Sequence, residues 1–594
     1  MISINFTMLR SLYLVFTICF FMVNGGYAQQ KLIKPVVVKP DEPFGLVFNH
    51  NGDLSFASAN PAEAEKLLKK TVDYIHSLEV KTLVYSVGVS SDVLYYPTKI
   101  ASTVGWRVTK EEQQNKLLKT RVENARACIA TGMDAVKIAG LQAKKNNMLF
   151  IPSLTMNDSR FTTDPQNSAY TSKFWLDNSN LTIKSAPNAF KKEYANLLDY
   201  THETVRNHRL QVIFEVIDRN KGNIDGFELD FNRVQTLFPE GKTQASLITE
   251  MIKKIREKLD INAKLQGKPM YLFVRIPSSE EACKQTGLDI ETWMKQGLVN
   301  MVSPSQLMTL AQDMPIQNLI AKAHQYKVKV YPTLMPKSNF RVPLKPSLPT
   351  LGLNLRIGSQ TATLEEMLTA AVNYRQMGAD GLYLFNYSIG DFPQDLYRLA
   401  AEINSKGISP VDRVFTVTKT AYNDNLQPSY SYTKQLPLKM QSANASLSIY
   451  IGELPTSSPY PLTRCLLRLG VRNFADAPKL LLNGKPLQVL HIEDHAISPR
   501  IAQVADGSQK TIIYKIDEPT LIKLGNNKVE IIAENATLTD LEIAYGYMTN
   551  LSYMVRGVAD TKLNQPITGT PAPLIKWDTS SKPTPKPKEI EEEP

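Results

Sequence analysis

The order of apolar and polar positions divides the chain into regions, and the longest regular one extends from Phe44 to about Ser405. Short apolar runs alternate there with longer segments in which apolar residues recur every three or four positions. The short runs are typical of buried strands and the longer segments of amphipathic helices. The pattern predicts eight strands, at residues 44–49, 82–88, 148–154, 224–231, 270–276, 298–303, 328–333 and 381–387.

Segments of helical period lie between these strands, at residues 62–78, 110–145, 189–219, 244–265 and 363–377. Strands that alternate with helices run parallel and are joined by right-handed crossovers. Eight repeats favour a closed (β/α)8 TIM barrel, which we assign to residues 41–408. A doubly wound open sheet is the alternative, but the glycine-rich dinucleotide loop typical of that fold follows none of the early strands.

Two long polar connections interrupt the barrel pattern. Residues 156–187 follow the third strand and residues 336–360 follow the seventh. The loops after barrel strands lie at the C-terminal face, where the active sites of TIM barrels are found. We therefore expect both connections to rise over the candidate site.

After residue 409 the pattern becomes all-β, with short strands at residues 446–451, 465–471, 479–482, 511–516 and 528–532. Asn483-Gly484 between two apolar runs is a strong hairpin signal. We predict a β-sandwich over residues 412–556. It is either a stabilising cap on the barrel or a carbohydrate-binding module, and the sequence leaves both open.

The two ends of the chain have other patterns. Arg10 is the single charged residue among the first thirty, an apolar run follows at residues 12–23, and Gly26 and Ala28 are small. This order predicts a signal peptide over residues 1–28, cleaved after Ala28. The mature protein is then expected in the periplasm or outside the cell, without an integral membrane anchor. Residues 561–594 are rich in Pro, Lys and Glu and are predicted to be disordered.

Composition narrows the function classes. With 43% hydrophobic and 21% charged residues, the chain is a globular protein and neither collagen nor a coiled coil. The net charge of +11 is scattered along the helical segments, which counts against a nucleic-acid partner. Cys128, Cys283 and Cys465 are far apart and have no metal-ligand partner at short spacing, so we predict buried free thiols. No metal site and no cofactor are predicted.

The fourth predicted strand contains the most informative segment, DGFELDFNR at residues 225–233. Side chains alternate along a strand, so Glu228, Asp230 and Asn232 share one face and the three phenylalanine and leucine residues share the other. Two carboxylates inside a barrel must be solvated, paired with cations or held neutral. Such a pair suits acid and base catalysis on an acetal. A structural ion pair with Arg233 or Arg275 is the alternative.

This segment, together with residues 274–305, resembles the exported glycosyl-hydrolase-like (β/α)8-barrel proteins, a family of glycosidase barrels similar to family 10. The resemblance includes SLTMND at 153–158 and LLDYTH at 197–202, and it covers the whole barrel. It implies a TIM-barrel hydrolase that acts on poly- or oligosaccharides and is often followed by a small β-domain.

The same strand is also similar to the chitinase-type signature D-x-x-D-x-D-x-E. Asp225 and Asp230 match its first and third aspartates, and Glu228 stands where the second would be. At the position of the proton-donating glutamate this chain has Asn232, and an amide cannot deliver a proton. The departure counts against the substrate-assisted chemistry of chitinases. The seventh strand, which ends at Leu334, offers no acid either.

Asp230 and Glu228 are therefore the predicted catalytic carboxylates, with Asp230 as nucleophile or base. The candidate substrate-binding residues are Asn157, Asp158, Asn232, Arg233, Arg275, Asn386 and Tyr387, and the aromatic residues that either stack on sugars or pack in the core are Tyr85, Trp106 and Trp175. Two hypotheses stay open. One is a secreted glycoside hydrolase, and the other is a non-catalytic glycan-binding protein, which the amide at Asn232 favours.

Overall fold

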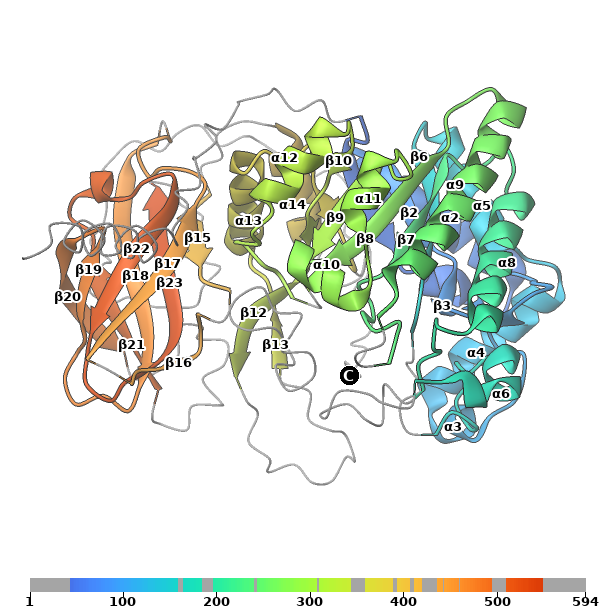
Figure 1. Ribbon diagram of the computed structural model, residues 1–594, viewed down its shortest axis with the longest axis horizontal. Coiled ribbons are helices and arrows are strands. Elements are labelled where there is room, and N and C mark those ends of the chain that lie inside the picture. Colours follow the sequence, from blue (N-terminus) through green and yellow to red (C-terminus); the bar gives the residue numbers. More distant parts are fainter. Residues whose placement is uncertain are drawn as a thin grey trace, which may run out of the picture. The chain divides into compact units, whose positions relative to one another are not determined.

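The computed structural model describes residues 43–158, 164–183, 196–239, 243–306, 309–342, 358–387, 393–405, 411–418, 435–441, 443–458, 460–493 and 509–547. The predicted signal peptide and the predicted disordered tail lie outside these ranges. Parts of the connections at 156–187 and 336–360 also lie outside them. Most of the described strands belong to one parallel sheet and one antiparallel sheet, each with its own core (Figure 1).

The parallel sheet is a closed barrel. Its strands, in chain order, are β1 (Leu46–His50), β2 (Val80–Ser86), β6 (Leu149–Thr155), β7 (Gly226–Asp230), β8 (Tyr271–Pro277), β9 (Met301–Ser305), β10 (Lys329–Val330), β11 (Thr333–Leu334) and β14 (Tyr383–Leu384). β10 and β11 are two halves of the seventh strand: β10 pairs with β9, and β11 pairs with β14. Since β14 also pairs with β1, the sheet closes on itself, and the predicted (β/α)8 fold is confirmed.

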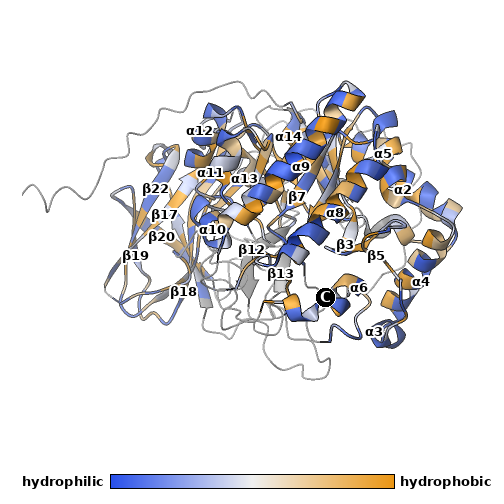
Figure 2. Ribbon diagram, turned by 45° about the vertical axis from the view of Figure 1, so that its right-hand side comes forward, coloured by the Kyte–Doolittle hydropathy of each residue, from blue (hydrophilic) through white to orange (hydrophobic). Residues whose placement is uncertain are grey.

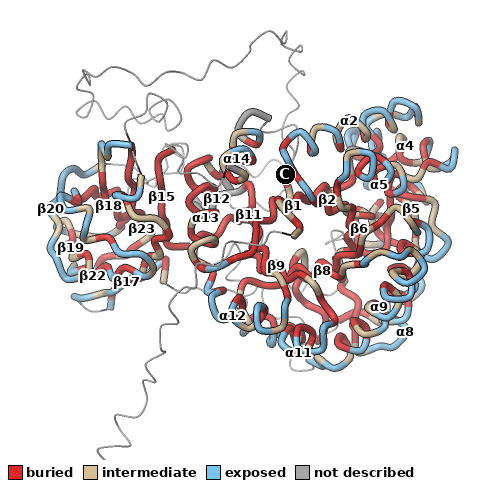
Figure 3. Tube along the Cα trace, turned by 90° about the horizontal axis from the view of Figure 1, so that it is seen from above, coloured by how far each residue is buried: buried red, intermediate tan, exposed pale blue. Residues whose placement is uncertain are grey.

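Helices cover the outside of the barrel (Figure 3). In chain order, the helices of the described residues are α2 (Pro61–Ser77), α3 (Lys110–Gln114), α4 (Lys116–Ala130), α5 (Ala135–Lys145), α6 (Lys173–Asp177), α8 (Glu203–Arg219), α9 (Ala245–Gln266), α10 (Glu280–Thr286), α11 (Ile290–Lys295), α12 (Gln317–Gln325), α13 (Leu364–Gln376) and α14 (Pro393–Ser405). Of these, the short helices α3 and α6 belong to the connections that follow β2 and β6. The predicted helical segment 110–145 is three helices. Asn115 and Asp134 each cap the start of a new helix with a side-chain oxygen. The apolar period continues across both residues, so the sequence pattern did not reveal these two helix boundaries.

Burial follows the helical period. In α2 the buried residues are Ala64, Leu68, Val72 and Ile75, three or four positions apart, and the polar residues face outward. Figure 2 shows this mixture of polar and apolar positions along the barrel helices. Within the described residues, none of the helices combines the length and the apolar character of a membrane span. Cys128, Cys283 and Cys465 are buried and free, as predicted.

Short strands also occur in the connections. After β2 come β3 (Gly88–Ser90), β4 (Val93–Leu94) and β5 (Ser102–Thr103), which form a small sheet. After β11, β12 (Lys337–Val342) pairs with β13 (Gly358–Thr361) in antiparallel fashion. The pair of β12 and β13 belongs to the connection that was predicted from sequence to rise over the C-terminal face of the barrel.

The all-β domain is a near-closed antiparallel sheet. Its strands are β15 (Arg413–Thr416), β16 (Leu438–Lys439), β17 (Asn444–Ile451), β18 (Leu462–Arg472), β19 (Lys479–Leu482), β20 (Lys485–Glu493), β21 (Gln509–Lys515), β22 (Gly525–Ile532) and β23 (Thr537–Tyr547). The predicted hairpin at Asn483-Gly484 joins β19 to β20, and both residues have positive φ. β20 pairs with β19 near its start and with β21 farther along, so the two faces of the predicted sandwich belong to one continuous sheet.

Candidate active site

The strand β7 places two carboxyl side chains inside the barrel. Its five residues are all buried between β6 and β8. A β-carbon at Gly226 would lie 2.1 Å from the carbonyl oxygen of Tyr271, so only glycine allows β8 to approach this closely. In the register of the sheet, Glu228 lies beside Ser153 of β6, and Asp230 lies beside Arg275 of β8. Strand alternation then directs the two acids to the same side of β7.

Glu228 is fully buried, with 0% of its surface exposed. Its Oε1 accepts hydrogen bonds from the Ser153 hydroxyl at 2.7 Å and from the Tyr383 hydroxyl at 3.1 Å. Its Oε2 has no hydrogen-bond partner among the described residues. Burial, and next the charge of Asp230, raise the pKa of Glu228 to about 7, although Ser153, Arg275 and Tyr383 oppose the rise. This carboxyl group therefore gains and loses a proton near neutral pH.

Asp230 is held by three donors. Its Oδ1 accepts the backbone N–H groups of Asn232, at 2.9 Å, and of Arg233, at 3.2 Å. The Arg275 guanidinium nitrogen Nη2 lies 2.8 Å from Oδ1 and 2.9 Å from Oδ2. Asp230 is 3% exposed and Arg275 is 2% exposed, so this is a buried ion pair. The ion pair that the sequence left open as an alternative for Asp230 is present, and its partner is Arg275.

Arg275 and Asn232 join this ion pair to neighbouring strands. Arg275 donates from Nη1 to the Ser305 hydroxyl at 3.0 Å, and its guanidinium lies 3.7 Å from the centre of the Phe385 ring. The Asn232 amide donates to the Ser305 carbonyl at 3.0 Å and accepts from Gln235. Asn232 therefore fastens the end of β7 to the end of β9.

Four more of the predicted binding residues lie just after strand ends, two after β6 and two after β14. Asn157 and Asp158 directly follow β6 and are buried. The Asn157 amide donates to two backbone carbonyls, each at 2.9 Å, and so holds loop segments together. Asn386 accepts from the Asn51 amide at 2.7 Å. The Tyr387 hydroxyl contacts the Met367 sulfur at 3.1 Å, which directs it into the core and away from the carboxyl pair.

Two of the predicted stacking residues are part of the core. Tyr85 is fully buried and its hydroxyl lies 2.6 Å from that of Ser55. Trp175 is buried and donates its indole N–H to the Asn196 carbonyl at 2.7 Å. Trp106 is half-buried and donates to the Thr171 carbonyl at 3.0 Å. Packing in the core, the other fate considered for these aromatic residues, accounts for Tyr85 and Trp175.

Sequence reasoning missed Ser153, Tyr383, Phe385 and Ser305. Tyr383 and Phe385 alternate in β14 and the residue after it, so both face the interior by the same parity that identified Glu228. Burial, together with the charge of Glu228, raises the pKa of Tyr383 well above its usual value, so its hydroxyl keeps the proton that it donates. Alternation along each strand could have shown from sequence that these side chains face the interior. Which of them lie beside Glu228 and Asp230 depends on the register between the barrel strands, which the sequence does not show.

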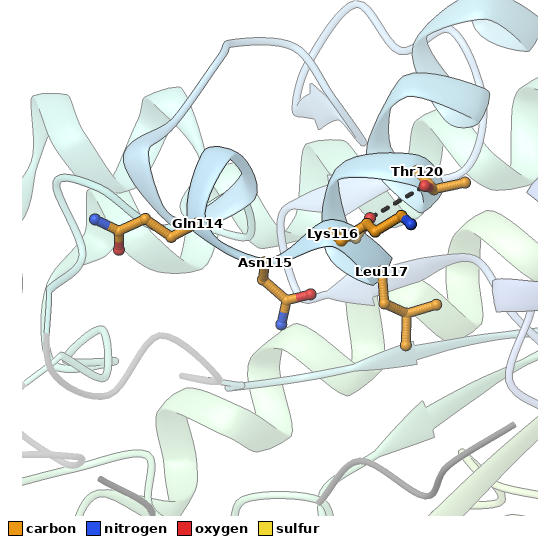
Figure 4. Close-up of a pocket in the computed structure, with 5 residues that line it drawn as sticks. All are labelled: Gln114, Asn115, Lys116, Leu117 and Thr120. Atoms are coloured by element: carbon orange, nitrogen blue, oxygen red, sulfur yellow. Dashed lines mark hydrogen bonds between the residues drawn. The ribbon is translucent and has the colours of Figure 1, made fainter. Parts of the chain in front are cut away.

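A shallow depression lies elsewhere, at the junction of α3 and α4 (Figure 4). It has a volume of about 460 Å³ and is lined by Gln114, Asn115, Lys116, Leu117 and Thr120. These residues include no acid and no aromatic ring, which gives the depression little means to bind or cleave a sugar. Among the described residues, no group of three or more His, Cys, Asp or Glu side chains is arranged to hold a metal ion.

We expect Tyr383→Phe to raise the pKa of Glu228 further, by about one pH unit. The hydroxyl donates to the ionised form of Glu228, and a hydrogen bond to a charged group contributes about 1.5–3 kcal/mol, where 1.36 kcal/mol corresponds to one pH unit. The carboxyl band of Glu228 in infrared spectra, followed against pH, measures the change. Tyr387→Phe is the matched control, since it removes a buried hydroxyl that bonds to Met367. An equal shift in both variants would contradict the expectation.

No protein-family model matches the chain, and no curated protein matches it. Its fold resembles those of solved glycoside hydrolases. A bacterial fucosidase is 12% identical, with 83% of this chain and 94% of the fucosidase covered and a TM-score of 0.35. The PgaB (BpsB) glycoside hydrolase domain from Bordetella bronchiseptica is 13% identical, with 61% and 99% covered and a TM-score of 0.36. The alpha-L-fucosidase GH29 from Bacteroides thetaiotaomicron is 12% identical, with 83% and 94% covered and a TM-score of 0.34. At these identities and scores, the likeness bears on neither substrate nor activity.

Proposed function

We propose that the chain is a glycoside hydrolase that cleaves a poly- or oligosaccharide with Glu228 and Asp230. The observation that carries the proposal is the pair itself. Glu228 has a pKa of about 7 and one oxygen without a described partner, and it stands two residues from an aspartate paired with Arg275. Two neighbouring carboxyl groups in different environments are the usual means of dividing acid and base roles in an active site. Glycosidic bonds are cleaved by such pairs.

In this proposal Glu228 is the general acid. Its Oε1 is occupied by Ser153 and Tyr383, so the transferable proton is carried on Oε2. That proton passes to the glycosidic oxygen as the bond to the anomeric carbon breaks. A pKa near the working pH suits this step, because the acid is protonated often enough and still releases its proton readily. Asp230 keeps the role of base that was predicted from sequence, and Glu228 takes the role of acid, which the sequence left unassigned.

Asp230 acts as the charged partner. Its Oδ1 accepts three donors, while Oδ2 accepts one from Arg275 and keeps acceptor capacity. We assign to Oδ2 the proton of the attacking water, whose hydroxyl adds to the anomeric carbon. The negative charge of Asp230 also stabilises the positive charge that develops on the sugar ring. The single nitrogen Nη2 of Arg275 contacts both oxygens and so fixes the direction of this carboxylate.

A non-catalytic glycan-binding protein is the second candidate. The near-complete burial of Glu228 and Asp230 favours it, and so does the use of the Asn232 amide to bind Ser305 and Gln235. On this hypothesis the barrel keeps a polar interior for structural reasons. The β-domain would then contribute to binding, as the sequence left open. Export through the leader at residues 1–28 is part of both proposals.

Incubation with a panel of polysaccharides separates the two candidates. We expect the purified protein to release new reducing ends from at least one polymer, and Glu228→Gln to release none above background. Retention on the same polymers is measured in parallel by affinity electrophoresis. Retention without release on every polymer would favour the binding protein, and neither retention nor release would reject both.

A further inference from the structure

A buried arginine on the outer side of the barrel connects several loops. Arg209 of α8 is 0% exposed. Its Nη1 lies 2.7 Å from Oδ1 of Asp92, and its Nη2 lies 3.2 Å from Oδ2. Nη1 also donates to the Ser91 carbonyl, and Nε donates to the Tyr200 hydroxyl at 3.2 Å. We call Ser91, Asp92, Tyr200, His208 and Arg209 the Arg209 cluster.

The cluster is fully satisfied. Asp92 also lies 3.0 Å from Nε2 of His208, whose ring stacks on Phe174 of α6 with 3.6 Å between ring centres. Burial alone would raise the pKa of Asp92, but Arg209 and His208 outweigh burial and hold it well below its usual value. A buried ion pair adds little net stability compared with apolar residues of similar size. The ion pair instead fixes the positions of the groups that bond to it, which apolar side chains would not do.

Partners of Arg209 hold the segment 156–158, which follows β6. The Tyr200 hydroxyl donates to the Met156 carbonyl, and the Ser91 hydroxyl accepts from the backbone N–H of Asp158 at 2.9 Å. The backbone N–H of Met156 in turn donates to the Asp230 carbonyl at 3.0 Å. The segment is therefore fixed on one side by the Arg209 cluster and on another by Asp230 itself.

We propose that Arg209 is a positioning residue. Acting through Asp92, Ser91 and Tyr200, it fixes the segment 156–158 beside Asp230 and so places Asn157 and Asp158 for substrate. The structural part of this inference stands on the contacts above. The part that concerns substrate rests on the proposed function and deepens it, because it assigns the placement of the candidate binding residues Asn157 and Asp158 to one buried guanidinium.

The test is the double variant Arg209→Met with Asp92→Leu, which replaces the buried ion pair by apolar side chains. Because such replacements are often neutral in stability, we expect a melting temperature close to that of the unchanged protein. Hydrogen exchange at the amides of Met156 and Asp158 should become at least tenfold faster. Affinity for an oligosaccharide that the unchanged protein binds should fall by a similar factor.

The matched control is Arg468→Met with Glu542→Leu in the β-domain, where Nη1 of the partly buried Arg468 lies 2.5 Å from the buried Glu542. It should leave exchange at 156 and 158 unchanged. Arg209→Lys is the second variant if the first fails to fold. Lysine keeps the charge but cannot reach Asp92, Ser91 and Tyr200 together.

Unchanged protection of both amides in a folded variant would overturn the positioning role. Faster exchange with unchanged affinity would overturn its link to substrate. If the unchanged protein binds no oligosaccharide, the proposed function fails, and the exchange measurement still decides whether Arg209 positions the segment.

Discussion

Glu228→Gln is expected to lower hydrolysis by roughly 10²- to 10⁴-fold while the fold survives. Glutamine has the size of glutamate and keeps an oxygen that accepts from Ser153 and Tyr383, but it cannot transfer a proton. Initial rates on the polymer that gives the most reducing ends measure the loss. Tyr387→Phe, which changes a buried side chain without touching the carboxyl pair, is the control for handling and folding. An active Glu228→Gln variant would remove Glu228 from the mechanism.

The same variant has an expected pH signature in stability. The pKa of Glu228 is about 7 in the folded chain and about 4.3 in an unfolded one. Folding therefore favours the protonated form, and the stability that this group contributes is complete below pH 4.3 and is lost as the pH rises through 7. The loss amounts to about 3–4 kcal/mol. The Glu228→Gln variant has no such loss, so between pH 4 and pH 8 its free energy of unfolding should rise by about 3–4 kcal/mol relative to that of the unchanged protein.

Urea unfolding of both proteins at pH 4, 6 and 8 measures this difference. Only the change with pH is compared, because the glutamine amide alters stability at every pH by leaving its own N–H groups without partners. A difference that stays flat across the range would mean that Glu228 is not the group with the raised pKa.

Asp230→Asn is expected to destabilise the protein by about 3–5 kcal/mol. The amide still accepts the backbone N–H groups of Asn232 and Arg233, but Arg275 keeps a buried charge without its partner. The double variant Asp230→Asn with Arg275→Met removes both charges and should recover much of the loss. Denaturation of the two variants and of Arg275→Met alone completes a double-mutant cycle.

An Asp230→Asn variant as stable as the unchanged protein would contradict the expectation that the buried charge of Arg275 needs its charged partner. Specific activity is measured on the folded fraction of the same preparation. If Asp230 directs the attacking water, activity falls even where the protein is folded. If Asp230 serves only the ion pair, the folded fraction keeps its activity.

Much of the barrel could be predicted from sequence because most of its buried strands are short, largely apolar runs that alternate with segments of helical period. The seventh strand shows the limit. Pro332 lies between β10 and β11, and the pairing passes from β9 to β14 around it, which a prediction over residues 328–333 does not reveal. The helix boundaries at Asn115 and Asp134 were missed for a different reason: both caps fall within an unbroken helical period.

In the candidate site, alternation along one strand gave the shared face of Glu228, Asp230 and Asn232. The partners of Glu228 were not accessible in this way. Ser153 reaches it through the register between β6 and β7, and Tyr383 reaches it across the closed barrel. The pKa of about 7 follows from that burial, so it required the three-dimensional arrangement. Arg275 was named from sequence as a possible ion-pair partner, but Arg233 was named beside it, and the sequence did not decide between the two.

The divided seventh strand has a consequence for how the barrel assembles. Only two residue pairs join β9 to β10, two join β11 to β14 and two join β14 to β1, whereas five join β2 to β6. The closing contacts also join distant parts of the chain, as the bond between Asn51 and Asn386 does across 335 residues. Long loops close slowly because much chain entropy is lost before the contacts form. We therefore expect the first six strands to form early in folding, and the seventh and eighth to complete the ring late and to open first.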